Sequence, residues 1–232
     1  MTSNGNRFEG AYNKIDALLR KKVPQSKTRS FSSIVIEVAN KDPTVRRNKD
    51  DLLEYGDLRN AIVHDRGKSP VLLADPRESV VVNIETILDS LSRPRILRSL
   101  APSVPLRIFP GDAALAETLS YMRTHRFSQV IALRDKRHVI LSTEGIALWL
   151  EAKAKEDIIA LSEARLNDAL HFEPTDSCIY LSANDTVDRA REVFTNDLGK
   201  RLFSALVTEH GRTQERPITI VTPWDFVAGA LR

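Results

Sequence analysis

The sequence is poor in cysteine, in aromatic residues and in long apolar runs. Cys178 is the only cysteine among 232 residues, which excludes an internal disulfide framework and a structural zinc site built on cysteines. No stretch approaches the roughly 20 apolar residues that cross a bilayer. The polar start, Met1-Thr-Ser-Asn-Gly-Asn, is followed by no apolar segment of the kind that secretory signals contain. We therefore expect a soluble, cytoplasmic protein without a membrane partner.

A strong excess of charge of one sign is also absent. The chain has 34 basic and 31 acidic residues and a formal net charge of +3. Residues 1–100 contain 18 of the basic and 13 of the acidic residues. This places any affinity for anions in the first half, although the usual explanation of such an imbalance is a solvated basic surface. The apolar fraction of 42% and the charged fraction of 28% are those of a globular protein.

The first hundred residues show helical periodicity. Apolar residues at spacings of three and four predict helices over Phe8–Lys22, from Ser30 or Ser32 to Ala39, from about Asn48 to His64, and from behind Pro76 to Leu91. Short polar segments join these helices. The pattern is typical of a small helical bundle.

From Leu100 onward, short β-type runs alternate with helices, and the same order occurs twice. The first pass predicts strands at Leu106–Phe109, Gln129–Leu133 and His138–Leu141, with helices through Leu115–Met122 and Glu144–Lys153. The second pass predicts strands at Ile179–Leu181, Leu202–Thr208 and Ile218–Val221, with helices from Val187 and over Trp224–Ala230. Two copies of a β-α-β-β-α unit imply pseudo-twofold packing. The predicted fold class is α+β, with a helical bundle over residues 1–98 and repeats over residues 99–165 and 166–232.

The second repeat ends in Val221-Thr222-Pro223-Trp224-Asp225, where a hydroxyl residue precedes an acidic residue by three positions. The double repeat with this ending resembles a tandem CBS domain pair. The resemblance implies a regulatory adenine-type ligand, such as AMP, ADP, ATP or a related adenosyl compound. Asp225 can accept hydrogen bonds from ribose hydroxyls, and Thr222, as a helix N-cap, can offer its hydroxyl to a phosphate. The alternative is a capping motif that needs no ligand.

Further contacts to such a ligand follow from the same resemblance. We expect the base to slot between strands and to read backbone groups near Ile179, Tyr180 and Leu181 and near Phe203, Ser204 and Ala205, because edge strands offer unpaired N–H and C=O groups. Trp224 is a candidate contact to the base, or else a core residue like Trp149. The histidines His138, His171 and His210 are expected at the surface.

The first repeat ends differently, in Ser142-Thr143-Glu144-Gly145. Ser142 keeps the hydroxyl, but Gly145 stands where the family has the ribose-binding acid. The first site is therefore either empty or takes a ligand without a ribose.

The third predicted helix contains Leu58-Arg59-Asn60-Ala61-Ile62-Val63-His64. On an ideal helix Leu52, Tyr55, Leu58 and Ile62 form one apolar seam, and Asn60 and His64 lie on the opposite side. The motif resembles the R-N-x-x-x-H signature of HEPN domains, helical bundles that include metal-independent ribonucleases. The resemblance implies that His64 acts as general acid or base, Arg59 holds a phosphate and Asn60 positions these groups. The alternative is a histidine at a helix C-terminus, with Arg59 in a surface ion pair.

These features lead to two hypotheses. In the first, a homodimeric regulatory protein binds an adenine nucleotide through its CBS pair and modulates a HEPN-like module that cleaves or binds RNA without a metal. In the second, the chain is a non-catalytic dimeric adaptor for a protein partner. The dimer is expected because helical faces with Leu115, Leu119 and Met122, and with Val193 and Phe194, are not all covered within one CBS pair.

Overall fold

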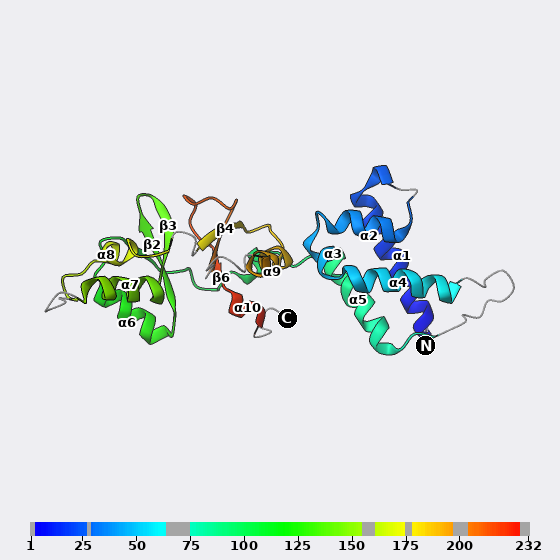
Figure 1. Ribbon diagram of the computed structural model, residues 1–232, viewed down its shortest axis with the longest axis horizontal. Coiled ribbons are helices and arrows are strands. Elements are labelled where there is room, and N and C mark those ends of the chain that lie inside the picture. The colour runs from blue at the N-terminus through cyan, green and yellow to red at the C-terminus, as the bar shows by residue number, and fades with distance from the viewer. Residues whose placement is uncertain are drawn as a thin grey trace. The chain divides into compact units, whose positions relative to one another are not determined.

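The computed structural model describes residues 3–26, 29–63, 75–154, 161–174, 178–196 and 204–227. The chain divides into two compact units, Met1–Arg95 and Ile96–Arg232. None of the helices in the described ranges combines the length and the apolar character that a membrane crossing requires. The first unit is helical, and the second contains both helices and strands. The protein therefore belongs to the α+β class (Figure 1).

The first unit consists of α1 (Asn4–Lys22), η1 (Pro24–Ser26), α2 (Phe31–Ala39), α3 (Pro43–Arg47), α4 (Lys49–Val63) and α5 (Glu78–Ser92). The four predicted helices are confirmed. The short helix α3 was not predicted, because the sequence analysis expected only a short polar segment after Ala39. Asp42 is instead the N-cap of α3, and its carboxylate accepts hydrogen bonds from the backbone of Thr44 (2.9 Å) and Val45 (3.2 Å).

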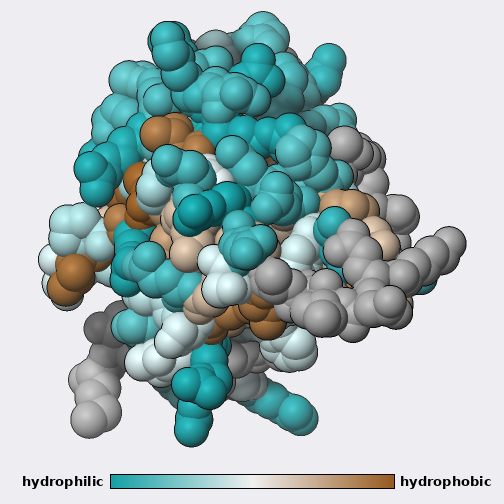
Figure 2. All heavy atoms as spheres, turned by 90° about the vertical axis from the view of Figure 1, so that its left-hand side faces the viewer, coloured by the Kyte–Doolittle hydropathy of each residue, from teal (hydrophilic) through white to brown (hydrophobic). Residues whose placement is uncertain are grey.

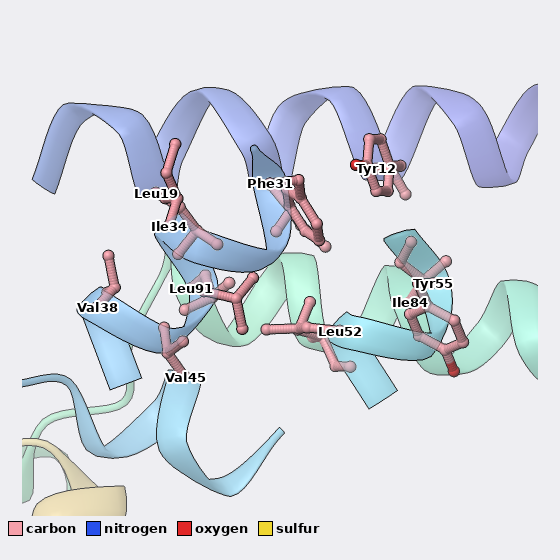
Figure 3. Close-up of a cluster of buried hydrophobic side chains, with 14 of the residues drawn as sticks. Tyr12, Leu19, Phe31, Ile34, Val38, Val45, Leu52, Tyr55, Ile84 and Leu91 are labelled. Atoms are coloured by element: carbon pink, nitrogen blue, oxygen red, sulfur yellow. The ribbon is translucent and has the colours of Figure 1, made fainter. Parts of the chain in front are cut away.

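The core of this unit forms where α1, α2, α4 and α5 face one another (Figure 3). Aromatic rings pack closely in it: Tyr12 and Phe31 have ring centroids 4.5 Å apart. The predicted seam on α4 is confirmed, since Leu52, Tyr55 and Ile62 are buried and Leu58 packs against the same core. Burial of this seam fixes how α4 is rotated about its axis, and so where the Arg59-Asn60 pair lies.

The second unit contains two sheets of the same design. In the first repeat, β1 (Ile108–Pro110) pairs in parallel with β2 (Gln129–Arg134), which pairs antiparallel with β3 (Arg137–Ser142). In the second repeat, β4 (Cys178–Ser182), β5 (Ser204–Thr208) and β6 (Thr219–Val221) pair in the same order and directions. The helices are α6 (Leu115–His125), α7 (Thr143–Lys153), α8 (Leu166–Leu170), α9 (Val187–Asn196) and α10 (Pro223–Val227), with the 3-10 helix η2 (Leu97–Leu100) before β1. The predicted β-α-β-β-α repetition is therefore confirmed.

The two repeats share an apolar cluster. Ile131 and Ile140 of the first sheet and Leu206 of the second are buried together, and Leu106, Ile108, Cys178, Tyr180 and Ile220 pack around them. The hydroxyl of Tyr180 donates a short hydrogen bond to the backbone oxygen of His138. The sheets therefore cover each other's faces, as the expected pseudo-twofold packing requires.

Each repeat also receives a short segment that precedes the other repeat in the sequence. Leu97 of η2 is buried in the core of the second repeat, and its N–H donates to the oxygen of Asp185 (2.9 Å). Leu166 of α8 is buried in the core of the first repeat, and its N–H donates to the oxygen of Ala113 (2.9 Å). Segments η2 and α8 are therefore exchanged: η2 packs against the second repeat and α8 packs against the first. The predicted boundaries after residues 98 and 165 do not match this packing.

Several predicted exposures are wrong. Leu115 and Met122 are buried in the core of their own repeat, where Leu119 packs beside them, and Val193 and Phe194 pack against the core of the second repeat. Figure 2 shows a mostly hydrophilic surface on the side that carries α6, α7 and α8, with separate small hydrophobic areas. Of the residues cited for dimerisation, Leu115 and Met122 are therefore buried, and Leu119, Val193 and Phe194 are partly buried within the chain.

Candidate functional site

The end of the second repeat forms a compact hydrogen-bonded turn. The backbone N–H of Thr222 donates to Oδ2 of Asp225 (2.7 Å), and the Thr222 hydroxyl donates to the same oxygen (3.0 Å). The Thr222 proton is thus engaged by the carboxylate, so this hydroxyl is not free to donate to a phosphate. Within the described residues no hydrogen bond reaches Oδ1 of Asp225, which leaves that oxygen as an acceptor.

Thr222 and Asp225 line a cavity of about 320 Å³ between the two repeats. This volume is at the lower end of the range for small-molecule sites. Ile220 belongs to the same wall. The opposite wall comes from the first repeat: Leu106, Arg107, Tyr121, Arg126, Phe127, Ser128, Gln129, Val130 and Ile131.

The cavity lies where a strand ladder ends. Ile108 is the first residue of β1 that pairs with β2, at Ile131, so Leu106 and Arg107 precede the paired region. Gln129 and Val130 pair only with β3 on their other side. Their backbone groups that face the cavity side are therefore not used by β1, and they can read the edge of a flat ligand.

Two arginines and two aromatic rings give this wall its chemistry. The Arg107 guanidinium lies over the rings of Phe109 (4.4 Å) and Tyr121 (4.8 Å) and forms a short ion pair with Glu117. Arg126 caps the end of α6 in the left-handed conformation (φ 55°) and is exposed. Phe127 is 49% exposed. A cavity with two cations, one carboxylate and an accessible ring suits a ligand with an aromatic base, hydroxyls and an anionic group.

Most of the predicted base contacts lie elsewhere. Ile179, Tyr180 and Leu181 are in β4, and Ser204 and Ala205 are in β5; none of them lines this cavity. Ala205 belongs to the central strand and pairs with both Ile179 and Val221, so its backbone has no unpaired groups of the kind expected. Phe203 lies outside the described residues.

The tryptophans and His138 differ from one another in burial. Trp149 is buried, as its core role predicts. Trp224 is 75% exposed, so its core role is wrong, and it does not line the cavity beside Asp225. His138 is buried, contrary to the expected surface position, and this burial lowers the pKa of its imidazole.

In the first repeat, a residue outside the motif binds Ser142. The Ser142 hydroxyl accepts a hydrogen bond from Gly145 N–H (3.1 Å) and donates one to Oε2 of Glu173 (2.9 Å). The backbone N–H of Ser142 donates to the same oxygen (2.9 Å). Ser142 therefore caps α7 and holds a carboxylate that the sequence motif lacks.

In the first unit, the Arg59-Asn60 pair lies near the end of α4. The Arg59 guanidinium lies 5.8 Å from the ring centroid of Tyr12, and its Nε is buried without a hydrogen-bond partner in the described part of the chain. Burial, and then the charge of Asp16, raise the pKa of Tyr12 to about 12, so the phenol stays neutral at physiological pH. Asn60 is exposed. His64 lies outside the described residues.

Sequence reasoning missed Arg107, Arg126, Phe127 and Glu173. The run Arg126-Phe127-Ser128-Gln129, which places a cation and an aromatic ring directly before a strand, is a signal that could have indicated the first wall. Glu173 gives no such signal, because its contact with Ser142 arises only from the exchange of α8 between repeats.

The second unit is thus a two-repeat α+β module with a cavity of about 320 Å³ between its repeats. Neither a protein-family model nor a curated protein sequence matches this chain. Solved structures of CBS-domain proteins are similar to it. One is the CBS domain of a membrane protein from Sphaerobacter thermophilus, at 15% identity over 64% of this chain and 96% of that chain, with a TM-score of 0.45.

Two further similar structures were solved with ligands. CBSX2 in complex with AMP is 12% identical over 59% of this chain and 96% of that chain, with a TM-score of 0.43. The CBS domain pair of protein MJ0100, in complex with 5-methylthioadenosine and S-adenosyl-L-methionine, is 15% identical over 60% of this chain and 99% of that chain, with a TM-score of 0.40.

Proposed function

We propose that the Ile96–Arg232 unit is a CBS pair that binds an adenine-type nucleotide in the cavity between the repeats and thereby regulates the helical unit. The observation that carries this proposal is the position of Asp225, which lines the cavity together with two arginines and an accessible aromatic ring. The closed turn of Thr222 and Asp225 holds the carboxylate in place before a ligand arrives.

The ribose is assigned to Asp225. Its Oδ2 is held by Thr222, and Oδ1 remains to accept a hydrogen bond from a ribose hydroxyl. Because the acceptor is charged and half-buried, such a bond contributes more than a neutral one.

The phosphate is assigned to Arg126 rather than to Thr222. The Thr222 hydroxyl already donates to Asp225, whereas Arg126 is exposed at the cavity and carries no ion pair within the described residues. The base is assigned to the ring of Phe127 and to the backbone of Gln129 and Val130, which β1 leaves unpaired.

Calorimetric titration of the full chain with AMP tests this assignment. Asp225→Asn removes the charge but keeps the shape and is expected to weaken AMP binding by about 10- to 100-fold, the effect of one hydrogen bond to a charged group. Asp135→Asn, at a side chain that is 88% exposed, is the matched control and is expected to leave affinity unchanged. If wild type and Asp225→Asn bind AMP with equal affinity, Asp225 does not belong to the binding site.

For the helical unit we propose a HEPN-like, metal-independent endoribonuclease in which Arg59 binds phosphate, Asn60 positions it and His64 transfers the proton. In support, Asn60 is exposed and the Arg59 guanidinium has no carboxylate partner in the described ranges. The placement of Arg59 on Tyr12 also fits the second candidate function, a non-catalytic adaptor, since a cation on a buried ring stabilises the bundle.

Cleavage of single-stranded RNA in EDTA, with and without AMP, separates these two functions. A nuclease is expected to leave 2′,3′-cyclic phosphate ends and to lose activity by at least 100-fold in His64→Ala and Arg59→Ala. Arg47→Ala, a basic residue of α3 outside the motif, is the control. The same cleavage in all variants would indicate a contaminating enzyme, and no cleavage in any nucleotide state would favour the adaptor.

A further inference from the structure

Two carboxylates that are unrelated in the sequence motif bind the ends of the two repeats in the same way. In the second repeat, Oδ2 of Asp225 accepts hydrogen bonds from the backbone and hydroxyl of Thr222 (2.7 and 3.0 Å). In the first repeat, Oε2 of Glu173 accepts the same two bonds from Ser142 (both 2.9 Å). Glu173 therefore occupies the place that the acid of the motif has in the second repeat.

Gly145 makes room for this carboxylate. A Cβ atom added at Gly145 would lie 2.2 Å from Oε2 of Glu173 and 3.3 Å from its Cα. No side chain at position 145 can share this space with Glu173. In the sequence, Gly145 shows only that the acid of the motif is missing. In the structure, the lack of a side chain at position 145 leaves the space that the Glu173 carboxylate fills. The carboxylate also lies at the N-terminus of α7, where a negative charge is favourable.

Strands β4 and β5 leave no unpaired edge of the kind that β1 and β2 leave at the cavity. The ladder between β4 and β5 is complete from Cys178 and Ser204 onward, whereas the ladder in the first repeat begins only at Ile108. Ser204 is fully buried, and Oε1 of Glu173 is buried with no hydrogen-bond partner in the described part of the chain. Burial raises the pKa of the Cys178 thiol to about 11, and the nearby charge of Glu173 adds to this shift.

We infer that Glu173 fills the first ligand site from within the chain, so that the pair has one open nucleotide site, at Asp225, and one that is permanently self-occupied. This inference rests on the proposed function for the class of ligand. It assigns to Glu173 the role of a selectivity residue, because it decides which of two related places in one fold accepts a nucleotide.

Counting bound AMP per chain by calorimetry and by equilibrium dialysis tests the inference. Wild type is expected to bind one AMP. Glu173→Ser, which removes the carboxylate, is expected to bind a second AMP more weakly than the Asp225 site does, because this place has neither an acid for the ribose nor an unpaired strand edge for the base. Gly145→Ala displaces the same carboxylate without removing it and is also expected to bind two. Glu173→Gln keeps both the bulk and an oxygen that can accept from Ser142, so it is expected to bind one. Glu151→Gln, an exposed position on α7, is the control.

Wild type with two sites would overturn the inference, and so would folded Glu173→Ser and Gly145→Ala chains that both keep a single site. Thermal unfolding of each variant establishes that it is folded. A wild-type chain that binds no AMP, or whose single site survives Asp225→Asn, contradicts the proposed function instead. In that case, an additional AMP site in Glu173→Ser or Gly145→Ala relative to wild type still supports the inference, and no additional site in either variant contradicts it.

Discussion

The carboxylate of Asp225 divides its two oxygens between the protein and the cavity. Oδ2 receives both donors of Thr222, which fixes the side chain, and Oδ1 is left as an acceptor. A preorganised acceptor of this kind loses little side-chain entropy when a ligand binds. Each of the other residues that line the cavity is likewise assigned to its own part of the ligand.

Arg126 is expected to recognise the phosphate. Arg126→Ala should weaken AMP binding by about 10- to 100-fold, because it removes a charge-assisted contact, and should leave the affinity for adenosine unchanged. Arg123→Ala, an exposed residue of the same helix that does not line the cavity, is the control. Titrations of both variants with both ligands check this, and an equal loss for adenosine would contradict the assignment.

Glu215 stabilises the loop between β5 and β6. Its carboxylate accepts hydrogen bonds from His210 N–H (2.7 Å) and Arg212 N–H (3.4 Å) and pairs with the His210 ring. Burial alone would raise the pKa of Glu215, but these bonds outweigh it and lower the pKa to about 2. Because the folded pKa lies below the ordinary value of 4.5, the stabilisation is complete above pH 4.5 and is lost as the pH falls towards 2.

Glu215→Gln should therefore lower the thermal midpoint at pH 7, and the difference from wild type should shrink between pH 4.5 and 2. Glu163→Gln, an exposed acid, is the control. Thermal unfolding followed by circular dichroism at several pH values measures this. A difference between the Glu215→Gln and wild-type midpoints that is independent of pH would show that the carboxylate charge contributes nothing.

At the scale of elements, the exchange of η2 and α8 links the repeats. Leu97 is fully buried in the core of the second repeat although it precedes the first repeat in the sequence. Leu97→Ala is expected to lower the free energy of unfolding by about 2–5 kcal/mol, the usual cost of a large-to-small change in a core. Val104→Ala, at a side chain that is 71% exposed, should change it by less than about 0.5 kcal/mol.

Urea unfolding followed by tryptophan fluorescence measures this effect in the right unit, since Trp149 and Trp224 both belong to Ile96–Arg232. Equal midpoints for Leu97→Ala and wild type would show that the exchanged segment contributes no stability.

The sequence predicted the regular elements well, because the period of their apolar residues is a local signal. The seam of Leu52 and Ile62 and the strands around Ile131 and Ile140 follow from it directly. It did not predict α3 or α8, which are only five residues long and carry too little periodicity. The cavity depends on where the ladder between β1 and β2 begins, and the Glu173 contact depends on an exchange between repeats. Neither is encoded in local spacing.

At the scale of the whole molecule, a homodimer remains our proposal, on different residues from those first considered. Leu148 and Leu150 of α7 are 38% and 39% exposed. Sedimentation equilibrium at micromolar concentration should give twice the chain mass of 26.1 kDa. Leu148→Asp should shift the equilibrium towards a single chain if α7 is the interface, and a 26.1 kDa wild-type species would contradict the dimer.

The central claim is that one adenine nucleotide binds between the repeats with its ribose at Asp225. A crystal structure of the full chain with AMP tests this most directly. We expect AMP in the cavity, with a ribose hydroxyl within hydrogen-bond distance of Asp225 Oδ1, the phosphate beside Arg126, and Glu173 still bound to Ser142. AMP bound at another place, or an empty cavity at saturating AMP, would contradict it.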